Sequence, residues 1–311
     1  MKMHDTPWNG QMCRTPFPFP TLAAMASGVP NITKASGEVV PFSREKLAAS
    51  LRRSGATPEI SEEIAERILS GLQPGTSTKR IYQQAFQLLR GRSRTSAGRY
   101  KLKRAIMELG PSGFPFERFI ARILELDGFA AQVGRIVHGR CVEHEIDVMA
   151  EKGDHRYLVE CKYHNQPGRV CDVKVPLYIH ARFLDVEGEW KRLPGNGTKQ
   201  HQGWVVTNTR FTGDALRYGT CAGLVMLSWD HPARNSLKAR IDHSGLYPLT
   251  CLGSLTKSEK SRLLENGVVL CQEIIQDPAV LEQAEVPRRR VQSVLHECEA
   301  LCERLNGRKK P

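Results

Sequence analysis

The stretch that decides the fold is His144-Glu-Ile-Asp147-Val-Met-Ala-Glu-Lys-Gly153-Asp-His-Arg-Tyr157-Leu-Val-Glu160-Cys-Lys162-Tyr-His164. Runs with β-branched and aromatic residues stand on both sides of Gly153-Asp154, a pair that favours a tight turn. The pattern predicts strands at 141–149 and 157–163, and another strand at 130–133 after Gly128. We therefore expect a sheet in the middle of the chain.

Strand periodicity predicts which side chains share a face of this sheet, because successive residues point to opposite sides. The apolar set predicted to face inward is Ile146, Val148, Tyr157, Val159 and Cys161. The same alternation sends Glu145 and Asp147 to the other face of the first strand, and Glu160 and Lys162 to the other face of the second. Two neighbouring strands are thus predicted to present Asp147, Glu160 and Lys162 to one pocket.

An amphipathic helix is predicted directly before these strands. Its apolar residues recur at helical spacing: Phe116, Phe119, Ile120, Ile123 and Leu124. Because each residue turns the helix by 100°, Glu117 falls at the rim of this face, whereas Glu125 points away from it. Glu117 is therefore a further candidate for the pocket.

These residue types suit metal-assisted hydrolysis of a phosphodiester. A hard cation such as Mg²⁺ prefers oxygen ligands, and carboxylates with substrate phosphate are its usual set. Asp147 and Glu160 are the predicted ligands for Mg²⁺ or Mn²⁺. Lys162 is predicted to orient or help deprotonate the attacking water and to stabilise charge on the phosphate, and Glu117 to act as an outer ligand or base.

The segment resembles the PD-(D/E)xK active site of Mrr-like, type IV restriction endonucleases. A helix predicted at about 173–184, a strand and turn at 203–212, a helix near 214–218 and a strand at 224–229 follow in the order expected of that family, so the resemblance covers most of 114–243. It implies an αβββαβ core and a nuclease activity. A structural sheet with exposed charges, and a degenerate nuclease that only binds DNA, are the alternatives.

Polar residues around the motif are weaker candidates. Asn208 and Arg210 could contact the substrate backbone, although Thr and Asn at a strand end more often close a turn, which we favour. No metal-ligand spacing unites His144, His164 and His180, so contact with phosphate or solvent is at least as good an interpretation for them.

The N-terminal third predicts a compact, mostly helical domain at 31–110. Residues 1–30 contain Met25 and several prolines and are expected to form a disordered leader, with Met25 as a candidate start. A hairpin is predicted around Ser36-Gly37, then a helix capped by Ser43 and two further helices, near 60–68 and 81–89. The Pro/Gly-rich joint 110–115 should end this domain.

The order of residues in this module resembles the ATP-cone, a nucleotide-binding regulatory domain. The matching residues are Ile32, Lys34, Gly37, Phe42, Lys46, Leu47, Thr78, Ile81, Ala97 and Tyr100. The resemblance implies that Lys34, Lys46 and Thr78 contact ATP or dATP, and ammonium and hydroxyl groups do suit phosphates. The chain departs from the usual cone at Ala35 and Val40. A scaffold that binds only DNA or a partner is the alternative.

The C-terminal part, 244–311, is expected to be a small helical tail. Short helices joined at Glu265-Asn-Gly267 vaguely resemble a helix-hairpin-helix, but a simple helical appendage is the favoured interpretation. The basic clusters Arg288–Arg290 and Arg308–Lys310 could add non-specific phosphate contacts.

Composition limits the classes of function. The chain carries a net charge of +12, and from Arg44 to Arg104 there are 14 Lys/Arg against 5 Asp/Glu, an excess of 14 − 5 = +9 that would attract polyanions. No run approaches the ~20 apolar residues of a membrane span. The nine cysteines form no metal pattern, since Cys298 and Cys302 with His296 fall short of a four-ligand site, so reduced thiols in a cytoplasm are expected.

The sequence therefore predicts an α+β or α/β protein that acts as a cytoplasmic, metal-dependent endonuclease on DNA and senses or binds nucleotide through its N-terminal domain. A nucleotide-responsive DNA-binding regulator without catalysis is the non-enzymatic alternative. A junction-resolving or repair nuclease would share the same chemistry. Target sequence, methylation dependence and assembly into a homo-oligomer stay open.

Overall fold

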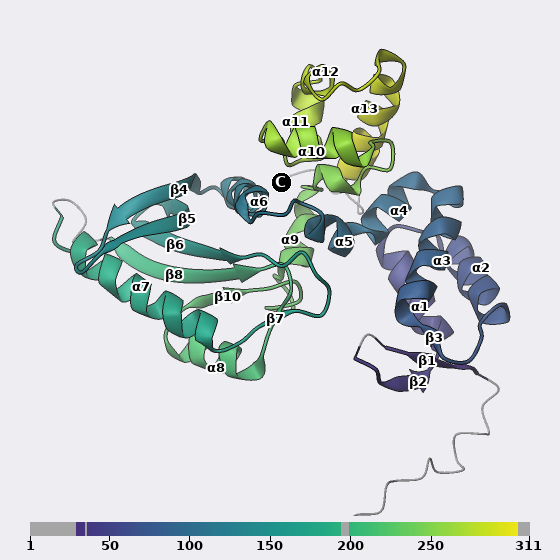
Figure 1. The fold of residues 1–311 in the computed structure, drawn as a ribbon, viewed down its shortest axis with the longest axis horizontal. Coiled ribbons are helices and arrows are strands. Elements are labelled where there is room, and N and C mark those ends of the chain that lie inside the picture. The colour runs from purple at the N-terminus through teal and green to yellow at the C-terminus, as the bar shows by residue number, and fades with distance from the viewer. Residues whose placement is uncertain (1–28, 35, 194–198, 304–311) are drawn as a thin grey trace, which may run out of the picture.

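The computed structural model describes residues 29–34, 36–193 and 199–303. Figure 1 shows a group of N-terminal helices above a small sheet, a larger central sheet flanked by helices, and a C-terminal group of helices. The fold is mixed α and β, as predicted. Residues 1–28 of the expected leader and the basic cluster Arg308–Lys310 lie outside the described residues.

A small three-stranded sheet opens the chain. Strands β1 (Asn31–Thr33) and β2 (Val39–Pro41) pair antiparallel, with Ile32 opposite Val40, which confirms the predicted hairpin. Gly37 turns the chain with a φ of 85°, a conformation that favours glycine. Strand β3 (Thr76–Ser77) joins β1 in parallel and completes the order β2-β1-β3.

Helices follow this hairpin: α1 (Arg44–Arg53), α2 (Pro58–Ser70), α3 (Thr78–Arg92), α4 (Arg94–Tyr100) and α5 (Leu102–Met107). The Ser43 hydroxyl accepts the Lys46 backbone N–H at 3.1 Å and caps α1, as predicted. Residues spaced by one helical turn form the buried core of this group, including Leu47, Leu51, Ile64, Ile68, Ile81, Ala85 and Leu89.

The central sheet has the order β10-β8-β6-β5-β4. Its strands are β4 (Ala130–His138), β5 (Glu143–Lys152), β6 (His155–Lys162), β8 (Gln200–Thr207) and β10 (Val225–Leu227). Neighbouring pairs from β4 to β6 are antiparallel and those from β6 to β10 are parallel. A short parallel pair, β7 (Val170–Cys171) with β9 (Arg210–Phe211), lies apart from this sheet.

Helices cover both faces of the sheet. Helix α6 (Phe114–Leu126) packs its apolar face against β5 and β6, in one core with Val148 and Val159. Helices α7 (Lys174–Trp190) and α8 (Gly213–Cys221) lie on the other face (Figure 1). The core therefore follows the predicted order αβββαβ, continued by α8 and β10.

One prediction about the sheet is wrong. Ile146 and Val148 do not share a face, because Ile146 packs with Val186 and Trp190 of α7, whereas Val148 lies in the core with α6. Pairing of β5 with β6 begins only at Val148, and the β4 residue Gly134, opposite Asp147, takes a positive φ of 63°. The regular pleat is therefore interrupted at Asp147, and alternation cannot be carried through it.

The C-terminal part is helical, as predicted. It comprises α9 (Leu237–Ser244), a short 3₁₀ turn (Leu249–Cys251), α10 (Lys257–Glu265), α11 (Cys271–Gln276), α12 (Val280–Gln283) and α13 (Arg288–Cys302). Its buried residues, such as Tyr247, Leu263 and Cys298, belong to the same apolar cluster as Phe116 and Phe119 of α6. The predicted division into three domains stays a prediction.

Across the described ranges, each helix is either too short or too polar to cross a bilayer.

Candidate active site

Strand β6 carries two of the predicted site residues. Val159 and Cys161 lie in the core shared with α6, so Glu160 and Lys162 belong to the opposite face of the strand, as predicted. Glu160 is only 8% exposed, and the Lys162 ammonium donates to its Oε1 at 2.5 Å. Because a buried carboxylate is costly without a partner, this pairing offsets the cost of burying Glu160.

Helix α7 supplies a second cation to the same carboxylate. The Arg182 guanidinium donates from Nη1 to Glu160 Oε2 at 2.6 Å, and its other Nη donates to the Glu145 carbonyl. Sequence reasoning missed this residue. The signal that could have found it is an arginine at helical spacing among Ile179, Phe183 and Val186, on the face that α7 turns to the sheet.

Asp147 lies where β5 loses its regular pairing. Its Oδ2 accepts the backbone N–H of Cys161 at 2.7 Å, so the carboxylate takes a donor that a regular ladder would use. Burial and the nearby charge of Glu160 raise the Asp147 pKa to about 6, against the opposing effects of that hydrogen bond, Lys162 and Arg182. The irregular strand thus brings Asp147 beside Glu160.

Glu117 enters from the first turn of α6. Burial raises its pKa to about 7, with further contributions from the charges of Asp147, Glu145 and Glu160. A carboxyl with a pKa near neutrality suits proton transfer. The helix prediction that left Glu117 at the rim of the apolar face is consistent with this position, since Phe116 and Phe119 are fully buried.

Lys162 is charged in this setting. Burial lowers its pKa, but the hydrogen bond and the charge of Glu160 outweigh burial, and the net shift is upward. An ammonium has donors only, so this form of Lys162 can orient water or stabilise anionic oxygen but cannot accept a proton.

The charge of the cluster suits a divalent cation. When ionised, the carboxylates Glu117, Glu145, Asp147 and Glu160 outnumber the cations Lys162 and Arg182, and 4 − 2 leaves an excess of two negative charges. Oxygen donors of this kind fit Mg²⁺ or Mn²⁺. Within the described ranges no three His, Cys, Asp or Glu side chains already converge as a metal cluster. An ion would therefore rest on Asp147 and on the Glu160 lone pairs left beside its two cations.

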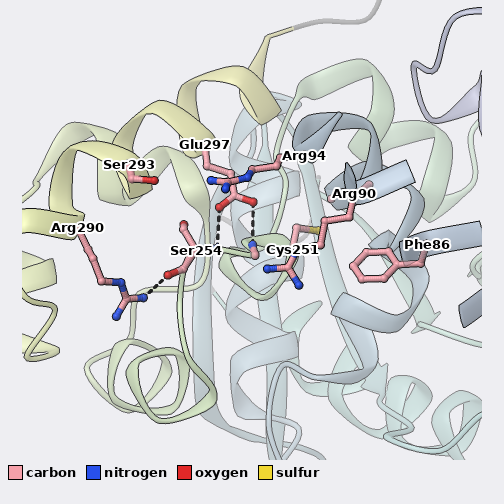
Figure 2. A pocket seen from close by; sticks show the side chains of 11 residues that line it. Phe86, Arg90, Arg94, Cys251, Ser254, Arg290, Ser293 and Glu297 are labelled. Carbon is pink, nitrogen blue, oxygen red and sulfur yellow. Dashed lines mark hydrogen bonds between the residues drawn. The ribbon is translucent and has the colours of Figure 1, made fainter. Parts of the chain in front are cut away.

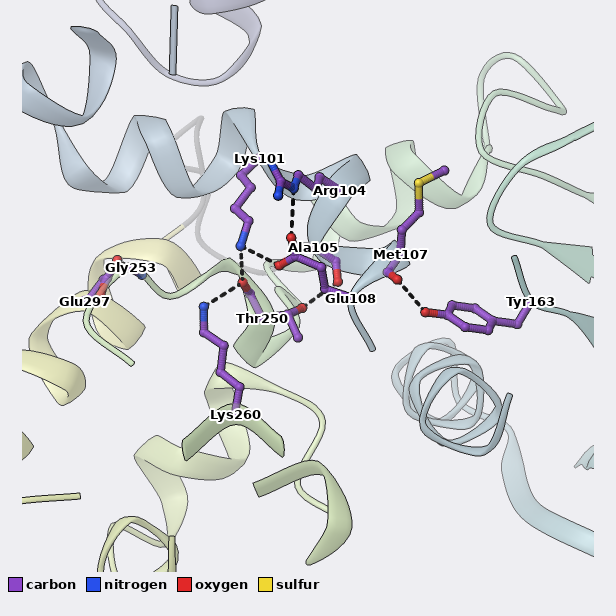
Figure 3. A network of polar contacts seen from close by, with 10 residues as sticks. All are labelled: Lys101, Arg104, Ala105, Met107, Glu108, Tyr163, Thr250, Gly253, Lys260 and Glu297. Carbon is purple, nitrogen blue, oxygen red and sulfur yellow. Dashed lines mark hydrogen bonds and ion pairs between the residues drawn. The ribbon is translucent and has the colours of Figure 1, made fainter. Parts of the chain in front are cut away.

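The end of β6 is tied to the helices before it. Tyr163, next to Lys162, donates its hydroxyl to the Met107 carbonyl at 2.7 Å and to the Gly110 carbonyl at 3.1 Å. On the other side of α5, Lys101 and Lys260 both donate to the backbone carbonyl of Thr250 (Figure 3). The Thr250 side-chain hydroxyl donates to the Ala105 carbonyl. Helix α5 is thus held between the strand with Lys162 and the C-terminal helices.

A surface depression of about 460 Å³ lies beside Lys162. Its lining includes Gly113, Tyr163, His164, Gln166 and Arg169. Burial lowers the His164 pKa, and the charges of Arg169 and Lys162 lower it further, so this side of the depression is basic without a charged histidine. It offers room for an anionic substrate next to the carboxylate cluster.

The remaining polar candidates have structural partners. Asn208 is buried and bonds the backbone of His164 in both directions, at 2.9 and 2.7 Å, which confirms that it closes the strand ends. Arg210 pairs with Asp230 at 2.6 Å, and His180 bonds the Tyr218 hydroxyl at 2.9 Å. His144 bonds Asp185 at 2.8 Å. These contacts account for the four side chains within the fold.

Asp185 explains the position of His144. Its carboxylate also accepts the backbone N–H groups of Cys141 at 2.8 Å and Val142 at 3.4 Å. The bond from His144, chiefly, lowers the Asp185 pKa to about 2. The pair fastens α7 to the turn between β4 and β5.

The predicted nucleotide contacts lie on the small N-terminal sheet. Because β1 and β3 are parallel with Thr33 opposite Ser77, Lys34 and Thr78 follow the same ends of adjacent strands. The Lys34 ammonium pairs with Glu38 at 2.9 Å, and Lys46 stands in the first turn of α1. The topology therefore brings Lys34 and Thr78 near each other.

Comparison with known proteins identifies relatives of this chain. A family model described as AF1548-like, C-terminal, matches residues 247–302. An uncharacterized protein of Archaeoglobus fulgidus is 37% identical over 156 residues, which are 50% of this chain and 83% of that protein.

Two solved structures are also similar. The crystal structure of the protein of unknown function AF1548 is 32% identical with a TM-score of 0.51, covering 61% of this chain and 98% of that one. MspJI restriction endonuclease in complex with a 27-mer oligonucleotide is 11% identical, with a TM-score of 0.26 over 77% of this chain and 48% of that chain, too low to support an argument. By its identity to the Archaeoglobus fulgidus protein and the coverage of that protein, the chain belongs to the AF1548-like family.

Proposed function

We propose that this protein is a metal-dependent endonuclease that hydrolyses phosphodiester bonds in DNA, with a PD-(D/E)xK site of the Mrr-like type. Asp147 and Glu160 are the metal ligands, Lys162 orients the attacking water, and Glu117 is an outer ligand or base. The proposed endonuclease acts in the cytoplasm, where the cysteines stay reduced.

The observation that supports this most is the gathering of Asp147, Glu160 and Glu117 around Lys162 on an αβββαβ core. Burial, together with the charges of neighbouring carboxylates, raises the pKa of Asp147 to about 6 and that of Glu117 to about 7. Groups whose pKa is shifted in this way are more common at functional sites than elsewhere. The depression beside Lys162 adds space for substrate.

Each residue then has one task in hydrolysis. A divalent cation, when bound, supplies Lewis acidity and positive charge beside the scissile phosphate. The Lys162 ammonium donates to the attacking water or to a non-bridging phosphate oxygen, where negative charge develops. Glu117 accepts the proton that the water gives up as its oxygen bonds to phosphorus, and the departing sugar oxygen takes a proton from solvent. Arg182 positions Glu160 through their 2.6 Å bond.

Plasmid cleavage with Mg²⁺ tests the function. Asp147→Asn should lower cleavage by ~10²-fold or more, because it removes a charged ligand at the reacting phosphate, and should leave the fold intact. Asp154→Asn is the matched control, since Asp154 is an exposed residue in the turn of the same strand pair. Equal cleavage by Asp147→Asn and the parent would exclude Asp147 as a ligand.

The class of DNA is tested by the same assay on different substrates. Methylated, unmethylated and branched DNA, each with and without ATP or dATP, distinguish a methylation-dependent restriction enzyme from a junction-resolving or repair nuclease. Preference for branched DNA would indicate a junction-resolving or repair nuclease, with the same residues performing the hydrolysis.

One observation favours the non-enzymatic alternative. Both Glu160 oxygens are already paired with cations, Lys162 at 2.5 Å and Arg182 at 2.6 Å. A site saturated in this way could be a scaffold that binds DNA through its basic surface. Cleavage by the pure parent protein, lost in Lys162→Ala, would reject this alternative.

We also propose that the N-terminal domain is an ATP-cone that binds ATP or dATP through Lys34, Lys46 and Thr78. The positions of Lys34 and Thr78, each directly after one of two paired parallel strands, support this. Calorimetry should show nucleotide binding by the parent and weaker binding by Lys34→Ala/Lys46→Ala. Lys174→Ala/Lys191→Ala, with the same change of charge at the two ends of α7, should bind normally. Absence of nucleotide binding by the parent would make the domain structural.

A further inference from the structure

A pocket of about 240 Å³ lies where the N-terminal helices meet the C-terminal helices. Its walls are the end of α3 and the start of α4 on one side, and α13 with the loop 251–254 on the other. Figure 2 shows Arg290, Ser293 and Glu297 of α13 on one side of the view and Arg90 and Phe86 on the other. None of the residues proposed for hydrolysis or for nucleotide contact in the ATP-cone lines this pocket.

The lining is basic. It contains Arg90, Arg94 and Arg290 against one acid, Glu297, and 3 − 1 leaves a formal excess of two positive charges. Arg290 is held by Glu259 at 2.6 Å and by the Ser254 carbonyl. The nearby Arg92 pairs with Glu63. Across the described ranges, neither Arg90 nor Arg94 makes an ion pair or side-chain hydrogen bond of its own. Their donors remain available to a ligand.

The one acid is fixed by the backbone. The Glu297 oxygens accept the N–H groups of Gly253 at 2.7 Å and Ser254 at 2.8 Å. This carboxylate therefore holds the loop that forms the pocket wall, and its charge is partly compensated by two amide donors. Burial raises the pKa of the Cys251 thiol to about 12, so that group adds no negative charge.

A hydroxyl in the wall has no partner. The Ser254 Oγ is buried and makes no hydrogen bond within the described residues. Buried polar atoms are almost always bonded, so rotation of this side chain towards the pocket that Ser254 lines would let a ligand there satisfy the hydroxyl. A hydroxyl and two guanidinium groups are all donors, which calls for an acceptor-rich ligand.

The volume limits the size of that ligand. At roughly 30 Å³ for each water of the liquid, the pocket has room for about eight waters. That space suits a compact anion of two or three condensed phosphates. A duplex backbone would have to bring its charges past the buried Glu297, so a nucleic-acid strand fits less well than a small ligand.

We propose that this pocket is a binding site for a condensed phosphate, either inorganic or the phosphate chain of a nucleotide. Arg90 and Arg94 bind its oxygens, Arg290 borders it, and Ser254 donates the remaining hydrogen bond. Guanidinium groups suit phosphate because their planar forks donate two bonds at once. The ligand bridges α3 and α4 to α13, so binding stabilises the contact between the two ends of the chain. This site does not depend on nuclease activity.

Calorimetry on the full chain tests the proposal with two probes, inorganic tripolyphosphate and ATP. The parent should bind tripolyphosphate at one site, and Arg90→Gln/Arg94→Gln should bind it at least roughly tenfold more weakly, because it loses two charged donors. Arg53→Gln/Arg67→Gln is the matched control, since both residues are exposed, unpaired within the described residues and in the last turns of α1 and α2. It should bind as the parent does.

The other arms identify the ligand. Ser254→Ala should weaken tripolyphosphate binding by a smaller factor and circular dichroism should show each variant folded. If ATP binding is also weakened in Arg90→Gln/Arg94→Gln but not in Lys34→Ala/Lys46→Ala, the pocket takes the phosphate chain of a nucleotide. If only tripolyphosphate binding is weakened in Arg90→Gln/Arg94→Gln, the ligand is an inorganic phosphate. No binding by the parent, or equal losses in the control, would overturn the proposal. The proposal would also be overturned if a short DNA duplex were the one ligand whose binding is weakened in Arg90→Gln/Arg94→Gln.

Discussion

Glu160 is the residue on which the candidate site turns. It takes one cation on each oxygen, Lys162 from its own strand and Arg182 from α7. A buried carboxylate is costly without charged donors, and these two contacts offset that cost. Asp147 and Glu117, which lack such partners, are the carboxyls whose pKa values rise. The cluster thus combines a carboxylate paired with two cations and two carboxyls that titrate near neutrality.

Cation binding should therefore depend on pH. The Glu117 pKa rises from 4.5 to about 7 and the Asp147 pKa from 3.8 to about 6, so the folded protein binds protons that the unfolded chain releases. Their contribution to stability is complete below about pH 4 and is lost as the pH rises towards 7. A divalent cation that competes with these protons should bind more tightly as the pH rises through the same range.

Thermal unfolding measures this effect. Mg²⁺ should raise the melting temperature more at pH 7.5 than at pH 5, because a ligand that binds the folded state stabilises it more when its affinity is higher. In Glu117→Gln the difference between the two pH values should shrink. A Mg²⁺ shift that is the same at both pH values would show that the ion binds elsewhere.

The sequence could predict that Asp147, Glu160, Lys162 and Glu117 gather in one place, because their spacing along strand and helix is local. It did not identify Arg182, which follows Glu160 by 22 residues and reaches it only when α7 packs on the sheet. A contact of that kind depends on tertiary packing, which periodicity does not report.

Strand β5 shows where pattern reasoning fails within an element. Alternation holds along β6, where Val159 and Cys161 share a core, but it breaks at Asp147, so Ile146 and Val148 pack on opposite faces. Ile146 and Val148 on either side of the break are strong strand formers, and the positive φ of Gly134 lies on the neighbouring strand. Irregularities of this kind gather next to active sites, where they re-aim a side chain.

The glycine that ends α9 should be required for the fold. Gly245 has a φ of 74°, and a Cβ on it would lie 2.6 Å from the Cys302 carbonyl oxygen, a backbone atom that cannot easily move. Gly245→Ala should lower the free energy of unfolding by about 1–3 kcal/mol from strain and steric conflict.

A second glycine provides the control. Gly188 lies inside α7 with open space around a Cβ, so Gly188→Ala should stabilise by about 0.5–1 kcal/mol. Urea unfolding of the two variants measures both effects. Equal changes for both would mean that the C-terminal segment does not pack against Gly245 as described.

The whole molecule is held together by contacts between distant parts of the chain. Arg99 of α4 donates to the carbonyls of Ala300 at 3.1 Å and Leu301 at 3.2 Å, at the end of α13. The C-terminal helices also share the apolar core of α6. The sequence predicted these helices, but only as a simple helical appendage. Nothing in a local pattern shows that residues about 200 positions apart will pack together.

Charge gives the whole chain a second, separable property. The excess of +9 between Arg44 and Arg104 should bind DNA mainly by counterion release, so affinity should fall steeply as salt rises, whatever the DNA sequence. DNA affinity of this origin is the sum of contributions from many basic side chains. Catalysis belongs to a few, and the two can be measured on the same variants.

The most direct test of the nuclease proposal measures DNA binding and DNA cleavage side by side in Lys162→Ala, with Lys174→Ala as the matched control on an exposed lysine. One ammonium is removed from a chain with 45 Lys/Arg, so the salt slope of binding should change by no more than about one unit in either variant. Cleavage should fall by ~10²-fold or more in Lys162→Ala and stay at the parent level in Lys174→Ala. Parallel loss of binding and cleavage, or a parent protein that binds DNA tightly and never cuts it with Mg²⁺ or Mn²⁺, with or without ATP or dATP, would contradict the nuclease assignment.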